Sequence, residues 1–227
     1  MDTIMTDTEI RELMCEIGRR IWQLGFVAAN DGNFTVKVSD NEFYTTPTGT
    51  SKGFLKPDMI IRVDEKGNVI EGRLRPSTEL PMHLRVYRER PDVGGIVHAH
   101  PPIATAFAVA HLPLDTFIMP EAILTLGSVP IAAYGTPSTQ EVPDGVAPLL
   151  PDHDVVLLEN HGALAVGKDL LTAYYRMETL EHYAKVSFYA KQLGGEREIT
   201  SEKLDALMEL RETMKIPGRH PGIRRER

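Results

Sequence analysis

Three histidines are spaced as the ligands of a divalent metal ion would be. His98 and His100 stand two residues apart in an apolar run, and His161 lies much later, between an asparagine and a glycine. Side chains alternate along a strand, so residues two apart project from the same face and present two imidazoles together. A third imidazole on a tight turn would complete one face of a metal ion and leave positions open for water or substrate, as in catalytic sites. The same spacing also fits three independent histidines, and the chain has eight in all.

Glu79 is the candidate for proton transfer. It follows Pro76-Ser77-Thr78, a pattern that predicts a helix capped by Ser77 or Thr78 with Glu79 in its first turn. A carboxylate there interacts favourably with the helix dipole, so a purely structural interpretation is open. In the functional interpretation, Glu79 lies beside the metal as a fourth ligand or as a base.

Three loops of small residues are candidates for anion binding. Ser77 and Thr78 place hydroxyls beside the free N–H groups of a helix N-terminus. Asp31-Gly32-Asn33 and the segment 46–50 (TPTGT) are loops that let backbone N–H groups approach a phosphate closely. Each loop taken alone also fits an ordinary turn.

Helices and strands must position these residues. Apolar residues at helical spacing predict helices over 7–24, 169–193 and 201–214, with another opening near 76–79. Two hairpins are predicted, 34–38 with 43–46 and 60–63 with 69–71, followed by short strands over 94–100, 129–133, 155–158 and 163–166. This mixture indicates an α/β fold with a largely antiparallel sheet. We expect one domain over 1–214, and a tail over 215–227, rich in Pro, Gly and Arg, that is mobile or ordered by a neighbouring subunit.

Composition narrows the class of protein. The formal net charge of -7 argues against nucleic acid or an anionic membrane as the main partner. Cys15 is the single cysteine, so no intrachain disulfide is expected. The N-terminus lacks a signal-peptide pattern, and no apolar run reaches the ~18 residues of a membrane helix. We expect a cytoplasmic protein.

In this order, the motifs resemble the class II aldolase/adducin family over nearly the whole chain. The matching segments are Gly25-Phe26, Asp31-Gly32-Asn33, Thr46-Pro47-Thr48-Gly49, Pro76-Ser77-Thr78-Glu79, His98-Ala99-His100 and Asn160-His161-Gly162. The resemblance implies a three-layer α/β/α sandwich on a mostly antiparallel central sheet. It also implies a homotetramer with active sites at subunit interfaces.

The resemblance further implies the roles of individual residues. Zn²⁺ would be held by His98, His100 and His161, with Glu79 as a catalytic acid/base that also approaches the metal. The positions that bind the substrate phosphate correspond to Gly32, Asn33, Thr48, Gly49, Ser77 and Thr78. Imidazole ligands also suit other divalent transition metals, so the resemblance leaves the native metal open.

The activity implied is the cleavage of a ketose 1-phosphate to dihydroxyacetone phosphate and an aldehyde. Candidate substrates are L-fuculose 1-phosphate, L-rhamnulose 1-phosphate and shorter deoxypentulose 1-phosphates. Aldolases of the family carry a tyrosine that protonates the aldehyde oxygen from a neighbouring subunit, whereas this chain has Glu121 at the corresponding point. Either Glu121 or a tyrosine elsewhere in the chain is expected to take this role.

Two other classes of function fit the same motifs. One is a sugar-phosphate 4-epimerase, dehydratase or decarboxylase of the same fold, although epimerases of the family carry Asp where this chain has Glu79. The other is a non-catalytic module similar to the adducin head domain. Such modules lack the metal histidines, and all three are present here.

Overall fold

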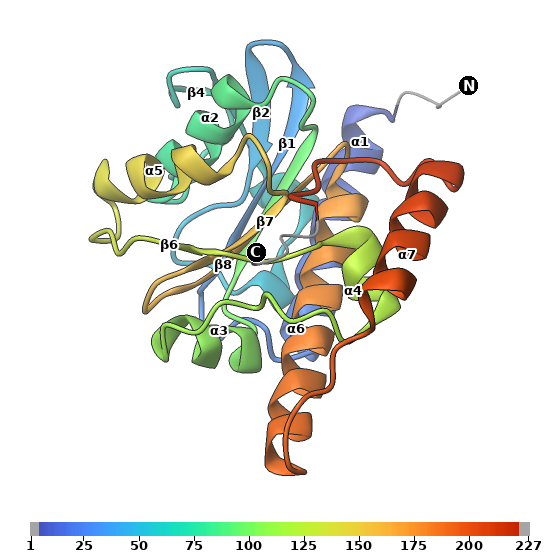
Figure 1. Cartoon of the computed structure of the whole chain (residues 1–227). Helices are drawn as coiled ribbons and strands as arrows, with labels where there is room; N and C mark the ends of the chain where they lie inside the picture. The colour runs from blue at the N-terminus through green and yellow to red at the C-terminus, as the bar shows by residue number, and fades with distance from the viewer. Residues whose placement is uncertain (1–4, 223–227) are drawn as a thin grey trace.

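The computed structural model describes residues 5–222 and shows helices on both faces of one sheet (Figure 1). The α-helices are α1 (Asp7–Gln23), α2 (Leu80–Glu89), α3 (Pro102–Val109), α4 (Pro120–Thr125), α5 (Glu141–Val146), α6 (Leu170–Gln192) and α7 (Ser201–Thr213). Short 3-10 turns are η1 (Lys52–Phe54), η2 (Pro57–Met59) and η3 (Ala147–Leu149). Between residues 5 and 222, no helix combines the length and the apolar character needed to cross a bilayer.

The sheet has eight strands in the order β4-β3-β2-β1-β5-β8-β7-β6. Their bounds are β1 (Asn33–Ser39), β2 (Glu42–Thr45), β3 (Ile61–Asp64), β4 (Val69–Glu71), β5 (Gly95–Ala99), β6 (Ile131–Ala132), β7 (Val155–Leu158) and β8 (Gly162–Gly167). Every neighbouring pair is antiparallel except β6 and β7, which run parallel. The prediction of a mostly antiparallel α/β/α sandwich is confirmed, with one parallel pair at an edge.

The core lies on both sides of the sheet because the central strands are apolar on both faces. Ile96 and Val156 pack with α2 and α5, whereas their neighbours Val97 and Leu157 pack with α1 and α6. Such double-sided burial accounts for the near-continuous apolar runs of β5, β7 and β8. The three layers hold these strands, and therefore the residues at their ends, in fixed register.

The C-terminal segment contacts its own chain over the described residues 215–222. Arg176 donates a hydrogen bond to the carbonyl oxygen of Pro217 at 2.8 Å, and the backbone N–H of Arg219 donates to Asp154 at 2.8 Å. His220 Nε2 donates to a main-chain carbonyl of α4 at 2.6 Å. The sequence patterns did not predict this ordering within the chain. Residues 223–227 lie outside the described part, and for them the expectation of a mobile or neighbour-ordered tail stays a prediction.

Asp154 is predicted to be a large contributor to stability. Its buried carboxylate pairs with Arg90 at 2.7 Å and with Arg176 at 2.8 Å, and both guanidinium groups are themselves buried. Asp154→Ala would leave two buried cations without this partner, so we expect the free energy of unfolding to fall by about 3–5 kcal/mol. Denaturant unfolding measures the loss, and the exposed Asp152→Ala is the control. A loss below about 1 kcal/mol, the worth of a surface ion pair, would contradict this account.

Candidate active site

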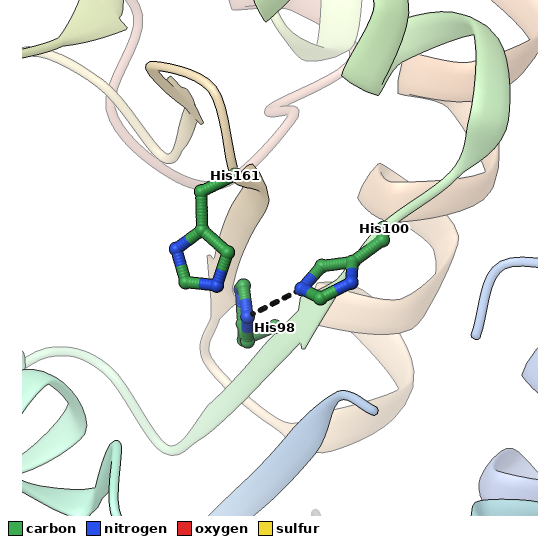
Figure 2. A group of neighbouring side chains, drawn as sticks. All are labelled: His98, His100 and His161. Atoms are coloured by element: carbon green, nitrogen blue, oxygen red, sulfur yellow. Dashed lines mark hydrogen bonds between the residues drawn. The ribbon is translucent and has the colours of Figure 1, made fainter. Parts of the chain in front are cut away.

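The three predicted histidines converge where β5 ends, beside the turn between β7 and β8 (Figure 2). His98 lies on β5, His100 directly follows that strand, and His161 lies in the turn between β7 and β8. The Nε2 atoms of His98 and His100 are 3.2 Å apart. One ring nitrogen from each of the three lies within 4.8 Å of the others. Strand alternation therefore does present the His98 and His100 rings together, and the turn adds the third.

The turn at 160–162 brings His161 to the pair because β8 lies beside β5. Asn160 adopts the left-handed backbone conformation with φ of 53°, which asparagine tolerates better than most residues. Gly162 is needed for the close approach, because a Cβ there would lie 2.5 Å from His100 Cδ2 and 2.7 Å from the carbonyl oxygen of Ala99. The sequence Asn-His-Gly thus encodes both the turn and the contact.

A hydrogen bond orients the ring of His98, and a carboxylate lies near the ring of His100. His98 Nδ1 donates to the carbonyl oxygen of Ala163 at 2.9 Å, which leaves Nε2 directed at the other histidines. His100 Nδ1 lies 3.5 Å from a carboxylate oxygen of Asp31. Partners of this kind fix the ring orientation and the tautomer of metal-binding histidines.

The carboxylate of Glu79 faces the histidine cluster. Its Oε2 lies 3.2 Å from His98 Nε2 and its Oε1 lies 3.3 Å from His161 Nε2. Asn33, at the start of β1 and paired with His98 on the neighbouring strand β5, donates a hydrogen bond to Oε2 at 2.8 Å.

The predicted start of the helix after Pro76 was wrong in detail. The helix α2 begins at Leu80, Glu79 is its N-cap residue, and no side chain caps that helix; Ser77 Oγ accepts a hydrogen bond from the backbone N–H of Glu79 at 3.3 Å.

The pKa values of Glu79, His98 and His100 are shifted by their burial and by one another's charges. Burial opposes the ionisation of Glu79, but the charges of His98 and His161 and the hydrogen bonds from His98 and Asn33 hold its pKa well below its usual range. Burial works against a charged His98 as well, yet the carboxylate of Glu79 outweighs burial and raises the pKa of that ring. Burial, with the positive charges at His98 and His161, lowers the pKa of His100 to about 4. The site therefore combines an ionised carboxylate with imidazoles that compete for positive charge.

The donor set fits a divalent transition metal. Three imidazoles with convergent ring nitrogens are typical ligands of catalytic zinc, and neutral imidazole also suits related metals. One cation among them would replace the competing protons, since metal binding and imidazole protonation exclude each other. Glu79 provides a carboxylate within reach, and the far side of the cluster opens to a cavity.

The cavity has a volume of about 210 Å³ and contains the predicted anion-binding loops. Most of its lining residues are polar residues or glycines. All six predicted phosphate-site residues belong to the lining: Gly32, Asn33, Thr48, Gly49, Ser77 and Thr78. Glu79, His100 and His161 line the same space, so an anion held by the loops would lie next to the cluster.

Glu121 is not brought to this cavity within its own chain. It is exposed in the first turn of α4 and contributes nothing to the cavity lining in the described part of the chain. Lys52 and Ser138 are among the lining residues that the sequence reasoning missed. The lysine at position 52 directly follows the glycine-containing loop 46–51, and a cation next to such loops was a usable signal.

A buried histidine beneath the site predicts a pH-dependent stability. His83 is fully buried on α2; its Nδ1 lies 2.9 Å from Thr35 Oγ1, and its Nε2 has no hydrogen-bond partner in the described residues. Burial lowers the pKa of His83 to about 3, assisted by positive charge at His98. Between that value and the ordinary 6.5, the unfolded chain binds a proton that the folded chain does not, so stability falls as the pH falls below 6.5.

The expected loss approaches about 1.4 kcal/mol per pH unit once the pH is well below the ordinary pKa of histidine. We expect His83→Leu to lose about 2 kcal/mol less stability than the wild type between about pH 7 and pH 5 in urea unfolding. His182→Gln, at an exposed position on α6, is the control. Parallel pH profiles for the wild type and His83→Leu would show that His83 is not excluded from protonation.

Comparison with known proteins agrees with this fold and this arrangement of motifs. The sequence model "Class II Aldolase and Adducin N-terminal domain" matches residues 12–188. The chain belongs to the class II aldolase and adducin family. Among its relatives, the L-fuculose phosphate aldolase of Methanocaldococcus jannaschii is 36% identical over 172 residues, covering 76% of this chain and 92% of that protein. The 3-oxo-tetronate 4-phosphate decarboxylase of Escherichia coli is 30% identical over 214 residues, covering 92% of this chain and 99% of its own.

Solved structures give the same result. An L-fuculose 1-phosphate aldolase superposes with a TM-score of 0.82 at 30% identity, covering 92% of this chain and 99% of its own. The L-fuculose-1-phosphate aldolase of Thermus thermophilus superposes with a TM-score of 0.73 at 32% identity, covering 83% of this chain and 98% of its own. Both the aldolase and the decarboxylase relatives therefore cover most of this chain.

Proposed function

We propose that this protein is a metal-dependent aldolase that cleaves a ketose 1-phosphate to dihydroxyacetone phosphate and an aldehyde, with zinc as its metal. One observation carries the proposal: the three-histidine cluster, Glu79 and the anion-binding loops face one cavity. The names of the aldolase relatives support the same reaction. The substrate at the aldehyde end would be of the L-fuculose 1-phosphate or 5-deoxypentulose 1-phosphate type.

Different residues of the site would bind the metal and the phosphate group. A divalent metal held by His98, His100 and His161 would supply a Lewis acid for the negative charge that develops on the substrate oxygens. The loops bearing Thr48 and Ser77 bind the phosphate, which fixes the reacting carbons beside the histidine cluster.

Glu79 moves the proton at carbon. A base at the aldehyde end takes the proton of the C4 hydroxyl, the C3–C4 bond breaks, and the electron pair of that bond remains on the dihydroxyacetone phosphate fragment as an enediolate. Glu79, after taking a proton from solvent, gives it to C3 of that fragment, and in the condensation direction its carboxylate removes the same proton. Condensation therefore starts from the ionised carboxylate of Glu79. The hydrogen bond from Asn33 holds one of its oxygens in place.

We further propose that Glu121 serves the aldehyde end of a neighbouring subunit's site in a homotetramer. Its exposed position on α4, outside the cavity of its own chain, is consistent with delivery to another copy. A Glu121→Gln variant would then lower turnover while leaving dihydroxyacetone phosphate affinity unchanged. Steady-state kinetics in both directions tests this assignment, and unaltered turnover would remove Glu121 from the mechanism.

A decarboxylase acting on a phosphorylated sugar acid is the second candidate. It is favoured by the decarboxylase relative of Escherichia coli, which matches 92% of this chain. Loss of CO₂ from a 3-oxo acid also leaves an enediolate, so the same cluster and the same proton donor would serve. The two reactions differ in the group that leaves, and the cavity lining alone favours neither.

A product screen tests both candidates. The metal-loaded protein is incubated with a panel of ketose 1-phosphates and with 3-oxo-tetronate 4-phosphate. We expect release of dihydroxyacetone phosphate from at least one ketose 1-phosphate and no CO₂ from the sugar acid. CO₂ release without dihydroxyacetone phosphate would establish the decarboxylase instead. An epimerase would interconvert ketose phosphates without releasing either product.

A further inference from the structure

Lys52 is a buried lysine in the wall of the active-site cavity. It is only 1% exposed, yet it belongs to the lining together with Thr48, Gly49 and Asn33. Its ammonium donates hydrogen bonds to the carbonyl oxygens of Asn30 at 2.8 Å and Thr50 at 2.7 Å. It therefore lies between the two loops that contain most of the predicted phosphate-site residues.

The third hydrogen of this ammonium group has no protein partner within residues 5–222, and Lys52 makes no ion pair there. Its charge is balanced only at longer range, by Asp31 and Glu79. Burial of an ammonium without a paired anion is costly, and proteins normally pair or neutralise such a group. Burial lowers the pKa of Lys52 to about 8 while these two carboxylates act in the opposite direction, so most of the group remains charged at neutral pH.

The backbone under Lys52 is held rigidly. Lys52 begins η1, which packs directly on α1. A Cβ at Gly18 of α1 would lie 2.4 Å from the carbonyl oxygen of Lys52, so the helix and the turn touch through their backbones. The ammonium group is therefore fixed by packing at its base and by two hydrogen bonds at its tip. Such a preorganised charge binds an anion without first having to be ordered.

Lys52 is also the sole lysine or arginine in the described lining of this cavity, where Asp31 and Glu79 contribute negative charge. A phosphate dianion entering beside two carboxylates needs compensating positive charge, and the net charge of the chain is unfavourable as well. We propose that Lys52 supplies the fixed positive charge that binds the phosphoryl group of the substrate. This inference rests on the proposed function, in which the substrate is phosphorylated. The unused N–H of Lys52 would donate to a phosphate oxygen as a charge-assisted hydrogen bond.

The test measures binding of inorganic phosphate to the full-length, metal-loaded protein by calorimetry, which requires no turnover. Lys52→Met removes the charge and keeps the apolar stem, while Lys52→Gln removes the charge and retains an N–H donor. We expect both variants to bind phosphate about 10- to 100-fold more weakly than the wild type with unchanged metal content. Lys56→Met, at an exposed position a short way along the chain, should bind phosphate like the wild type.

A second measurement, on the wild-type protein alone, distinguishes two roles of Lys52. In one role its charge binds the phosphate, and in the other its hydrogen bonds only hold the two loops together. Phosphate affinity should fall as the pH rises above about 8, where free Lys52 loses its proton; the second role would not require this. Wild-type affinity for the phosphate dianion that is constant from about one pH unit below this value to one unit above it, or variants that bind phosphate normally, would overturn the proposal. Phosphate binding that depends on Lys52 in a protein without aldolase activity would refute the proposed reaction and leave the role of Lys52 standing.

Discussion

Glu79→Gln is expected to lower the turnover of aldol cleavage at least a hundredfold while the protein keeps its metal. The substitution preserves the shape of the side chain, and an amide oxygen can still accept the hydrogen bond from Asn33. An amide cannot exchange a proton with the substrate carbon, and removal of a general acid/base costs about 10²- to 10⁴-fold. Three imidazoles remain to hold the metal, so its content should stay near that of the wild type.

The measurement pairs steady-state cleavage kinetics with elemental analysis of the same samples. Exchange of the C3 proton of dihydroxyacetone phosphate with solvent provides a second readout, because that exchange needs Glu79 and no aldehyde. Glu65→Gln, an exposed carboxylate in the turn before β4, is the matched control. If Glu79→Gln turned over and exchanged protons like the wild type with metal bound, Glu79 would have no part in catalysis.

His161→Ala is expected to weaken metal binding more than about a hundredfold and to abolish activity at ordinary metal concentrations. Loss of a partner that only orients a ligand already costs about 10- to 100-fold in affinity, so loss of a ligand should cost more. His161 is a better choice than His98 because its side chain is partly exposed, whereas His98 is completely buried and its removal would leave an internal cavity.

Metal per chain is measured after equilibration with a competing chelator, and circular dichroism checks that the variant is folded. The wild type should lose activity with the chelator and regain it when zinc is returned. His182→Ala, on the exposed face of α6, should retain both metal and activity. A His161→Ala protein that holds one metal per chain as tightly as the wild type would refute the three-histidine site.

Much of the candidate site could be predicted because its geometry depends on short-range rules. Alternation along β5 puts the His98 and His100 side chains on one face, and the sequence Asn160-His161-Gly162 encodes a tight turn. That His161 meets the pair follows from β8 lying next to β5. This neighbour relation joins residues far apart in the chain, and the resemblance to a family supplied it rather than the local pattern.

Other features were not predicted from the sequence, among them two helices and a buried lysine, and some of these depend on tertiary contacts. The helices α3 and α4 were not predicted, although each begins with a proline at its first position, Pro102 and Pro120, where proline is favoured. Glu79 falls at the N-cap of α2, and its side chain contacts His98 and His161 without capping the helix. The burial of Lys52 could not be predicted from its neighbours in sequence, because it results from the packing of η1 on α1.

The two outer strands of the sheet are short, and this limits how copies of this chain can associate. One outer strand, β4, spans only Val69–Glu71, and the other, β6, only Ile131–Ala132. Borders this short offer few free backbone N–H and C=O groups to an incoming strand, which protects the protein against edge-to-edge aggregation. A ring of subunits, such as the tetramer proposed above, would therefore be joined through helices and loops and not by a sheet that continues from one copy into the next.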